Sequence, residues 1–448
     1  MKKLNITFCS FPDFSGNAKA LYEYMIKRYK DNMNYIWIVY NKDSLRILEE
    51  KGIKAILIGT DEFKSYIPTT NVFFTTQGNL DGDKLKAKDS VYIELWHGIG
   101  PKPIGFACKN PSDEDIRGYS NISEVVDCFV VPNDFWKVVF GATFKAENNR
   151  IKSLGMPILD YFKYSDGKKN LSKVLNKSIS SYNKIIMYMP TYKKGFNHND
   201  VNNNYNNLFN FAESFDIKKL DEFLKDNNYL LCVKKHPGES TELNFENTSN
   251  ILNIKEESLT KNCISVNEII NAFDLLITDY SSIGTEFLFL ERPVLFITSD
   301  KEEYSKNRGI LFGNFDFWMP GPKVNDFKAL CIETSKLLND NEYYSEERKK
   351  SRNLWFGNVK DGGCKEICDY VFEQYGINEN FSRYDSKIFK LQDEIKDREN
   401  KMKEKDEIID ARNARIRELD TFISEIINSK GWQTLEKLRN IKKKILRK

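Results

Sequence analysis

The sequence predicts an α/β protein with two parallel sheets in series, each covered by helices. Short apolar runs of strand type alternate with helical segments up to about residue 160. After a polar stretch near 164–182, a second alternation of the same kind begins. The 448 residues exceed the usual size of one domain, and 40% of them are hydrophobic. Because such alternation is typical of helix-covered parallel sheets, we expect one domain over 1–165 and a second over 180–376.

The expected elements of the first half follow from these apolar runs and from helical spacing. We expect strands at Asn5–Cys9, Tyr35–Val39, Ala55–Ile58, Val72–Thr75, Val91–Leu95 and Cys128–Val131, and helices near Ala18–Tyr29 and Ser44–Glu50.

The second half repeats the pattern. We expect strands at Lys184–Met189, Tyr229–Val233, Ile251–Asn253, Leu275–Thr278 and Val294–Ile297, and helices at Ile217–Asp226, Asn267–Ala272 and Ile283–Leu290. Two such domains predict a nucleotide-type enzyme with its site in the cleft between them.

The most informative segment of the second half joins its strand Leu275–Thr278 to the helix after it. The connecting turn is Asp279-Tyr280-Ser281-Ser282, which is rich in hydroxyl groups. A turn at a helix N-terminus favours an anion, because backbone N–H groups and the helix dipole point at it. Hydroxyl groups also suit phosphate oxygens. On local chemistry alone, helix capping by the two serines explains the turn equally well.

Other loops at predicted strand ends carry groups suited to phosphate chemistry. His97 follows the strand Val91–Leu95 in a loop shaped by glycine and proline, and imidazole near neutral pH suits proton removal from a hydroxyl. His236 follows the strand Tyr229–Val233, and Thr191 and Lys193 follow Lys184–Met189. We expect the loops of the second half to converge at one place. For His97, the alternative interpretation is a histidine that only stabilises its loop.

The C-terminal region differs in pattern from the rest of the chain. Over residues 385–428, apolar residues recur at heptad spacing, with Ile388, Ile395 and Met402 among them, which predicts a coiled coil pairing two or more copies through 388–426. A single solvated helix packed by one stripe is the alternative. Residues 429–448 hold eight Lys or Arg and one Glu, with apolar residues three to four apart. This segment predicts a basic amphipathic helix at an anionic membrane surface; a disordered basic tail or a nucleic-acid arm is the alternative.

Composition narrows the classes of partner, compartment and cofactor that the protein can have. The net charge of +3 is too small to argue for nucleic acid as a partner, and no run approaches the roughly 20 apolar residues of a membrane span. No signal peptide is recognised, and the eight scattered cysteines are typical of a reducing compartment, so we expect a cytoplasmic protein. We expect no metal and no cofactor, since no metal-ligand spacing, P-loop or dinucleotide fingerprint stands out.

An ordered set of motifs resembles a known family. The set is Trp96-His97-Gly98 with Lys102 and Gly105, Met189-Pro190-Thr191, Lys235-His236-Pro237, and Ile277-Thr278-Asp279-Tyr280-Ser281-Ser282 with Arg292-Pro293. Gly16-Asn17-Ala18-Lys19 and the later Tyr304 and Arg308-Gly309 add to it. Over roughly residues 10–375 the chain resembles the CDP-glycerol glycerophosphotransferases, the polymerases and primases of teichoic acid and capsule synthesis.

This resemblance implies a GT-B-type fold with the donor nucleotide on the second domain and the acceptor on the first. It implies His97 as the general base. The matching positions for donor contact are Thr191, Lys193, Lys235, His236, Thr278, Asp279, Ser281, Ser282, Thr285 and Glu286, and those on the acceptor side are Gly16, Asn17, Lys19 and Lys102. The chain departs from the family pattern at Lys193, where the lysine loses the bidentate fork of arginine, and at Glu286, where aspartate is frequent.

The expected reaction is therefore transfer of a polyol phosphate, glycerol phosphate first, from a CDP-activated donor to a hydroxyl of a lipid-linked or polymeric glycan, with release of CMP. The enzyme would work at the inner face of the cell membrane, as a peripheral protein. A nucleotide-sugar glycosyltransferase or epimerase of the same architecture is one alternative. A non-catalytic membrane-associated scaffold is the other.

Overall fold

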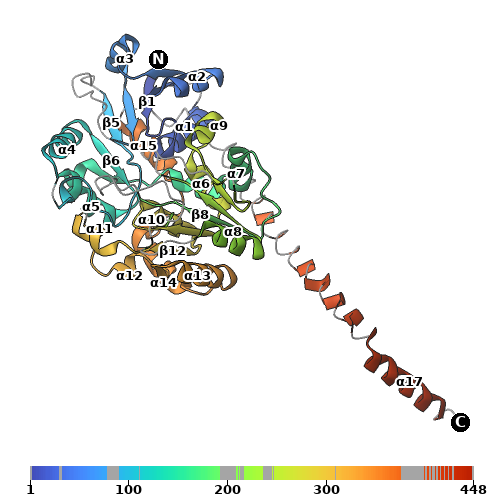
Figure 1. Ribbon diagram of the computed structural model, residues 1–448. Helices are drawn as coiled ribbons and strands as arrows, with labels where there is room; N and C mark the ends of the chain where they lie inside the picture. The colour runs from blue at the N-terminus through green and yellow to red at the C-terminus, as the bar shows by residue number, and fades with distance from the viewer. Residues whose placement is uncertain are drawn as a thin grey trace. The chain divides into compact units, whose positions relative to one another are not determined.

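The computed structural model of the chain has two compact units, Met1–Gly376 and Ile377–Lys448. In the first unit it describes residues 3–29, 33–77, 90–109, 111–191, 208–209, 211, 216–235, 245, 247–307 and 309–374. In the second unit it describes residues 398, 401–402, 405, 409, 412–413, 415–417, 419–421, 423–425 and 428–445. Both sheets lie in the first unit (Figure 1).

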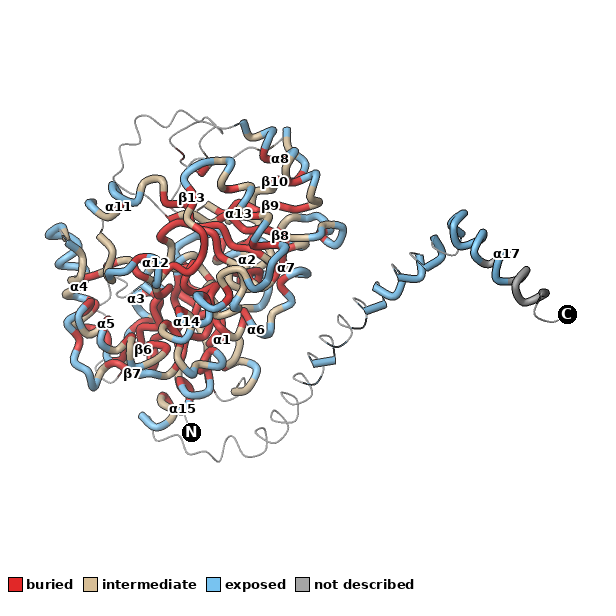
Figure 2. Tube along the Cα trace, turned by 90° about the horizontal axis from the view of Figure 1, so that it is seen from below, coloured by how far each residue is buried: buried red, intermediate tan, exposed pale blue. Residues whose placement is uncertain are grey.

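The first sheet has seven parallel strands in the order β3-β2-β1-β4-β5-β6-β7. They are β1 (Leu4–Cys9), β2 (Met33–Val39), β3 (Ala55–Leu57), β4 (Val72–Thr75), β5 (Val91–Glu94), β6 (Cys128–Val131) and β7 (Ile151–Ser153). Most of their residues are buried, as in strands that helices cover on both faces (Figure 2). The strand order reverses between β1 and β4, and ligands of such sheets bind beyond the carboxyl ends of the strands at this point.

Polar side chains set where the helices around this sheet begin. The helices are α1 (Gly16–Tyr29), α2 (Lys42–Glu50), α3 (Asp61–Tyr66), α4 (Asp113–Val125) and α5 (Asp134–Phe144). Asn41 caps α2, since its side chain accepts a hydrogen bond of 2.7 Å from the Asp43 N–H. Ser112 and Asp115 form a capping box at the start of α4.

The second sheet has six parallel strands in the order β10-β9-β8-β11-β12-β13, with its reversal between β8 and β11. They are β8 (Lys184–Tyr188), β9 (Tyr229–Val233), β10 (Ile251–Asn253), β11 (Leu275–Thr278), β12 (Val294–Ile297) and β13 (Lys323–Val324). The helices around this sheet include α8 (Ile217–Asp226), α9 (Glu256–Asn262), α10 (Ser282–Phe287), α13 (Phe327–Asn339) and α14 (Ser345–Phe356). Two parallel sheets in this arrangement confirm the expected fold class.

Three helices tie the two halves together. α6 (Ile158–Tyr164) contacts α1 and also the turns that precede β11. α7 (Gly167–Leu175) occupies the polar stretch that the sequence marks as a boundary. α15 (Cys364–Gln374) follows the second sheet in the chain but packs on the first half, where Ile367 and Cys368 share a core cluster with Ile6 and Phe8. The domain boundaries 1–165 and 180–376 stay a prediction. α15 lies within the expected range of the second domain, but it packs on the first half.

Two expected helices differ in type from the structure, and the helices α4, α5, α13 and α14, of 11 to 13 residues, were not among the expected elements. The helix expected at Asn267–Ala272 is a pair of 3₁₀ turns, η6 (Val266–Glu268) and η7 (Ile270–Ala272). A segment this short completes few i→i−4 hydrogen bonds, so the tighter turn prevails. The helix expected at Ile283–Leu290 divides into α10 and the 3₁₀ turn η8 (Leu288–Leu290). The strands β7 and β13 were also not among the expected elements.

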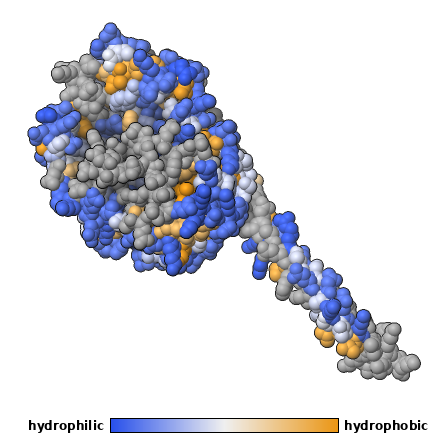
Figure 3. All heavy atoms as spheres, viewed as in Figure 1, coloured by the Kyte–Doolittle hydropathy of each residue, from blue (hydrophilic) through white to orange (hydrophobic). Residues whose placement is uncertain are grey.

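In the second unit, the described residues between 398 and 425 are helical, and α17 spans Lys430–Ile445. The heptad residues Met402, Ile409, Ile416 and Ile423 are between 50% and 63% exposed. The heptad residues Ile388, Leu391, Ile395 and Ile426 lie outside the described residues, and the predicted pairing stays a prediction. Apolar and polar residues both reach the surface along this unit (Figure 3). Within the part of the chain that is described, no helix is long and apolar enough to cross a membrane.

Candidate active site

His97 stands just past the end of β5, in a turn held by buried polar contacts. Trp96 adopts a left-handed conformation with a φ of 53°, which turns the chain sharply after the strand. Its N–H donates to the Glu94 carboxylate over 2.7 Å. The buried Asn17 side chain donates to the backbone carbonyls of Leu95, at 3.2 Å, and of Trp96, at 2.9 Å. The expected acceptor-side residue Asn17 therefore supports the His97 loop.

The contacts of His97 define which ring nitrogen holds the hydrogen. Its Nδ1 atom lies 2.9 Å from the backbone carbonyl oxygen of Thr76. A carbonyl oxygen only accepts, so Nδ1 carries the hydrogen and Nε2 carries the lone pair. The ring also packs against Trp96 with the centroids 4.3 Å apart. An exposed imidazole held in this tautomer is suited to accept a proton at Nε2.

The serine turn lies on the opposite side of the cleft, at the start of α10. Ser281 is the N-cap residue of α10, but its side chain makes no capping hydrogen bond. The structure therefore disfavours the capping interpretation for this residue. The Ser281 and Ser282 side chains both line the cleft, as expected.

The His97 loop and the serine turn are in direct contact. A Cβ atom placed on Gly98 would lie 2.8 Å from the Ser282 Oγ atom and 2.6 Å from the Glu286 Oε1 atom. A Cβ atom on Gly100 would lie 3.1 Å from the Ser282 Cα atom. Glycine at both positions, with no Cβ atom, permits this close approach without displacing the neighbouring atoms. The first sheet thus brings its histidine to the hydroxyl-bearing turn of the second.

Glu286 is buried within this contact, with 3% of its surface exposed. Burial raises the pKa of its carboxyl to about 8, and hydrogen bonds from the Ile99 backbone and the Ser282 side chain oppose the rise. The Oε1 atom makes no hydrogen bond within the described part of the chain. The carboxyl is therefore protonated at neutral pH, and it borders the cleft as a neutral group.

Three of the expected donor-binding residues organise the loops around them. The N–H and the hydroxyl of Thr191 both donate to Asp279 Oδ1, over 2.8 and 2.5 Å. The Thr191 hydroxyl hydrogen is thus committed to Asp279, although the residue lines the cleft. The Thr278 hydroxyl donates to the Met189 carbonyl over 2.7 Å. Thr191, Asp279 and Thr278 together join the loop after β8 to the loop after β11.

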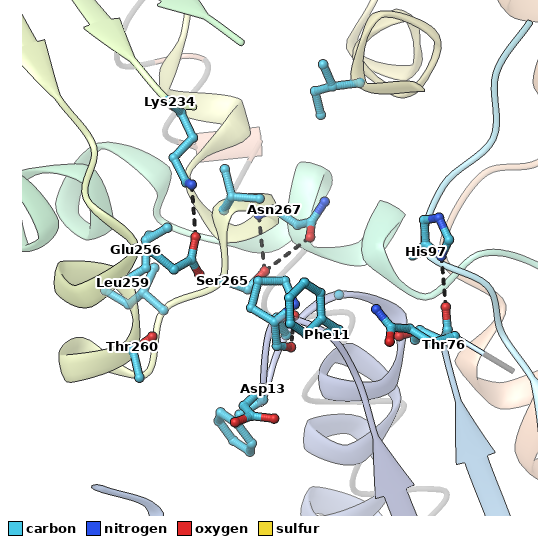
Figure 4. Close-up of a pocket in the computed structure, with 18 of the residues that line it drawn as sticks. Phe11, Asp13, Thr76, His97, Lys234, Glu256, Leu259, Thr260, Ser265 and Asn267 are labelled. Atoms are coloured by element: carbon cyan, nitrogen blue, oxygen red, sulfur yellow. Dashed lines mark hydrogen bonds and ion pairs between the residues drawn. The ribbon is translucent and has the colours of Figure 1, made fainter. Parts of the chain in front are cut away.

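The cleft between the sheets has a volume of about 400 Å³. Figure 4 shows His97 with Thr76 at one side and Glu256, Leu259 and Thr260 at the other. Seven of the expected site residues line it, namely Gly16, His97, Lys102, Thr191, Ser281, Ser282 and Glu286. These seven residues, which come from several loops, therefore lie at one cleft, and their roles stay a prediction.

Lys234 is a cleft residue that the sequence reasoning missed. Its side chain is 4% exposed, and Nζ contacts the Glu256 carboxylate at 2.9 Å and donates to the Lys235 carbonyl over 2.8 Å (Figure 4). Lys235, which was expected to contact the donor, is not among the residues that line the cleft. Lys234 follows β9 directly, so closeness to the strand end was the available signal.

The remaining expected site residues have other places. Lys193 and His236 lie outside the described residues. Thr285 is buried, and a Cβ atom on Gly100 would lie 3.6 Å from its hydroxyl oxygen. Lys19 lies beneath the cleft surface, with 1% exposed. Among the described residues, no group of three or more His, Cys, Asp or Glu could hold a metal ion.

Comparison with known proteins places the chain in a family. Residues 1–373 match the model of the CDP-glycerol:poly(glycerophosphate) glycerophosphotransferases. The chain belongs to this family. It is thus an enzyme of the glycerophosphotransferase class, as the motifs predicted.

Similar glycerophosphotransferases cover most of the chain. The teichoic acid glycerol-phosphate primase of Bacillus subtilis (strain 168) is 27% identical over 340 residues, 73% of this chain and 82% of the primase. The teichoic acid glycerol-phosphate transferase of Staphylococcus aureus (strain NCTC 8325 / PS 47) is 24% identical over 377 residues, 80% of this chain and 90% of the relative.

Solved structures show the same fold. The wall teichoic acid polymerase TagF matches with a TM-score of 0.67 at 23% identity, covering 86% of this chain and 91% of that one. MnaA of S. aureus, solved with UDP, matches with a TM-score of 0.51 at 12% identity, covering 84% and 98%. The glycerophosphotransferase described here therefore has the GT-B-type architecture.

Proposed function

We propose that this enzyme transfers glycerol phosphate from CDP-glycerol to a hydroxyl of a teichoic-acid-type acceptor, lipid-linked or polymeric, and releases CMP. The observation that carries the proposal is the packing of the His97 loop, through Gly98 and Gly100, against the serine turn. His97, whose Nδ1 hydrogen is bonded to the Thr76 carbonyl, lines the same cleft as Ser281, whose hydroxyl makes no capping hydrogen bond. The family description supports CDP-glycerol as the donor, and the names of the relatives support glycerol phosphate and a teichoic-acid acceptor.

In this reaction the acceptor hydroxyl gives its proton to the Nε2 atom of His97. Its oxygen attacks the distal phosphorus of the donor and forms the new P–O bond. The bond from that phosphorus to the bridging oxygen breaks, and CMP leaves with the electron pair. Ser281, Ser282 and Lys102 line the cleft, where the serine hydroxyls would donate to phosphate oxygens and the lysine ammonium would balance the phosphate charge. Lys193 and His236 remain predicted contacts of the donor phosphates.

Release of CMP by the purified protein tests the proposal. The assay compares CDP-glycerol, CDP-ribitol and a UDP-sugar, with and without a membrane acceptor. His97→Asn retains a side-chain N–H that can donate to the Thr76 carbonyl but removes the base. We expect turnover to fall by about 10²–10⁴-fold while CDP-glycerol still binds. Wild-type turnover in this variant removes His97 from the chemistry, and turnover of the UDP-sugar alone would favour the nucleotide-sugar alternative.

We also propose that α17 holds the enzyme at an anionic membrane surface. Trp432, Leu435 and Leu438 are 45%, 63% and 58% exposed. They follow one another at helical spacing within a segment of eight basic residues and one acidic residue, 429–448. An amphipathic helix of this charge binds at the interface of anionic lipids. Pairing of copies through 388–426 is a separate proposal, and a fall to the monomer mass in solution after truncation at Gly376, which removes this segment, would support it.

A further inference from the structure

Lys19 is a buried lysine whose ammonium joins the two halves of the first unit. It lies on α1, and 1% of its side chain is exposed. Its Nζ atom is paired with the Glu268 carboxylate and donates to the Cys263 carbonyl over 2.7 Å. The Glu23 carboxylate lies 3.5 Å away. The ammonium thus bridges α1 of the first half to the turn η6 of the second.

The surroundings of Lys19 keep water away from this contact. The Phe14 and Tyr161 rings flank Nζ, with centroids at 5.2 and 5.7 Å. The Tyr161 hydroxyl donates to the Glu23 carboxylate over 2.7 Å. A charge in such a site is costly unless it is paired, so the contact with Glu268 persists only while the two halves remain together.

The partners of Lys19 form one wall of the cleft. The segment Cys263–Asn267 lines the cleft on the side of the second sheet. The Glu268 Oε2 atom that pairs with Lys19 also accepts a hydrogen bond of 2.7 Å from the Ser265 N–H. Ser265 in turn accepts a hydrogen bond from the Asn267 N–H over 3.1 Å (Figure 4). One buried ammonium therefore fixes both ends of this wall, through the Cys263 carbonyl and through Glu268.

We propose that Lys19 is a positioning residue that holds the Cys263–Asn267 wall in its binding conformation and so sets the affinity of the cleft for nucleotide. Lys19 does not line the cleft, and it acts through the wall rather than on the substrate. The wall lies on the donor-binding half, so the choice of CDP as ligand rests on the proposed function. The structural part, a wall ordered by Lys19, does not depend on that choice.

The test removes both charges of the pair. Lys19→Met with Glu268→Gln leaves no buried charge unpaired, and Glu268→Gln alone is the second variant should the double variant not fold. The matched control is Lys365→Met with Asp369→Asn, an ion pair on α15 whose side chains are 68% and 51% exposed. Calorimetry measures CDP binding, and hydrogen exchange measures the Ser265 amide.

In the folded double variant, Lys19→Met with Glu268→Gln, we expect the Kd for CDP to rise at least tenfold. We also expect the Ser265 amide to exchange at least tenfold faster. The control variant should keep both values within twofold of the wild type. If the folded double variant keeps wild-type affinity for CDP and wild-type exchange at Ser265, the proposal is overturned. If the wild type binds no CDP, the proposed donor fails, and the exchange comparison alone then decides the role of Lys19.

Discussion

Gly98 and Glu286 belong to different halves of the cleft, yet a Cβ atom on Gly98 would lie only 2.6 Å from the Glu286 Oε1 atom. The loop that carries His97 therefore rests directly on α10, the helix that begins with the serine turn. This contact couples the position of the proposed base to the position of the proposed diphosphate contacts. Three predictions concern this contact and the serine turn beside it, and a fourth concerns the basic helix of the second unit.

The glycine at position 98 should be required for activity. We expect Gly98→Ala to lower the free energy of unfolding by about 1–3 kcal/mol, because the added methyl overpacks the contact. Displacement of His97 should also lower turnover by about 100-fold. The control is Gly118→Ala in α4, where a Cβ atom meets nothing within 4 Å. That variant should be as stable as the wild type or up to about 1 kcal/mol more stable. Urea unfolding measures the stability of the two variants, and CMP release measures their turnover. Equal stability and turnover of the two variants contradict the prediction.

The Glu286 carboxyl should make stability depend on pH. Its pKa is about 8 in the folded protein, against 4.5 for the ordinary carboxyl. Between these values the folded state holds a proton that the unfolded state has lost, so this group lowers stability as the pH rises from 4.5 to 8. Glu286→Gln stays neutral, and its stability relative to the wild type should increase over that window by on the order of a few kcal/mol. Urea unfolding at pH 5, 6.5 and 8 measures the difference, and a constant difference would falsify the assignment.

Ser281 and Ser112 are both N-cap residues, but they should respond differently to alanine. Ser112 forms a capping box, so Ser112→Ala should cost about 1 kcal/mol of stability and leave turnover unchanged. Ser281 makes no capping hydrogen bond, so Ser281→Ala should leave stability nearly unchanged. Loss of a phosphate contact should instead lower its kcat/KM by about tenfold. Thermal melting and steady-state kinetics separate the two, and a destabilised but fully active Ser281→Ala variant argues for capping.

The basic helix should carry membrane binding. Truncation after Glu425 should abolish sedimentation with anionic liposomes, and the wild type should sediment less as salt rises. Serine at Trp432, Leu435 and Leu438 together should weaken sedimentation, because these side chains would enter the interface. Alanine at Gln433 and Thr434, polar residues of the same helix, is the control. Unchanged sedimentation of the truncated protein rules out this role for the tail.

The sheets and the convergence of the loops were predictable because their signals are local. β4, β6, β8 and β11 are nearly continuous apolar runs, and a parallel sheet places the loops after its strands at one edge. His97, Ser281 and Ser282 therefore meet as expected. The type of an expected element was wrong only in short segments, as at Val266–Ala272, where two 3₁₀ turns replace the expected helix.

The opposite wall of the cleft was not predictable in the same way. Lys19 was expected to face the acceptor, but its partners lie 244 and 249 positions away in the chain, and no periodic pattern reports such contacts. Lys234 lines the cleft and Lys235 does not, although both are lysines beside the end of the same strand. Side-chain direction at a strand end depends on the packing of the adjacent loop, which composition does not encode.

The placement of α15 has a consequence for synthesis on the ribosome. Ile367 and Cys368 are fully buried in the core cluster that contains Ile6 and Phe8 of the first strand. The apolar surface that α15 covers on the first half therefore stays open to solvent until residue 374 has left the exit tunnel. A nascent chain that ends after the first sheet would expose this surface to chaperones and proteases, and the last helix of the first unit would act as the closing step of its maturation.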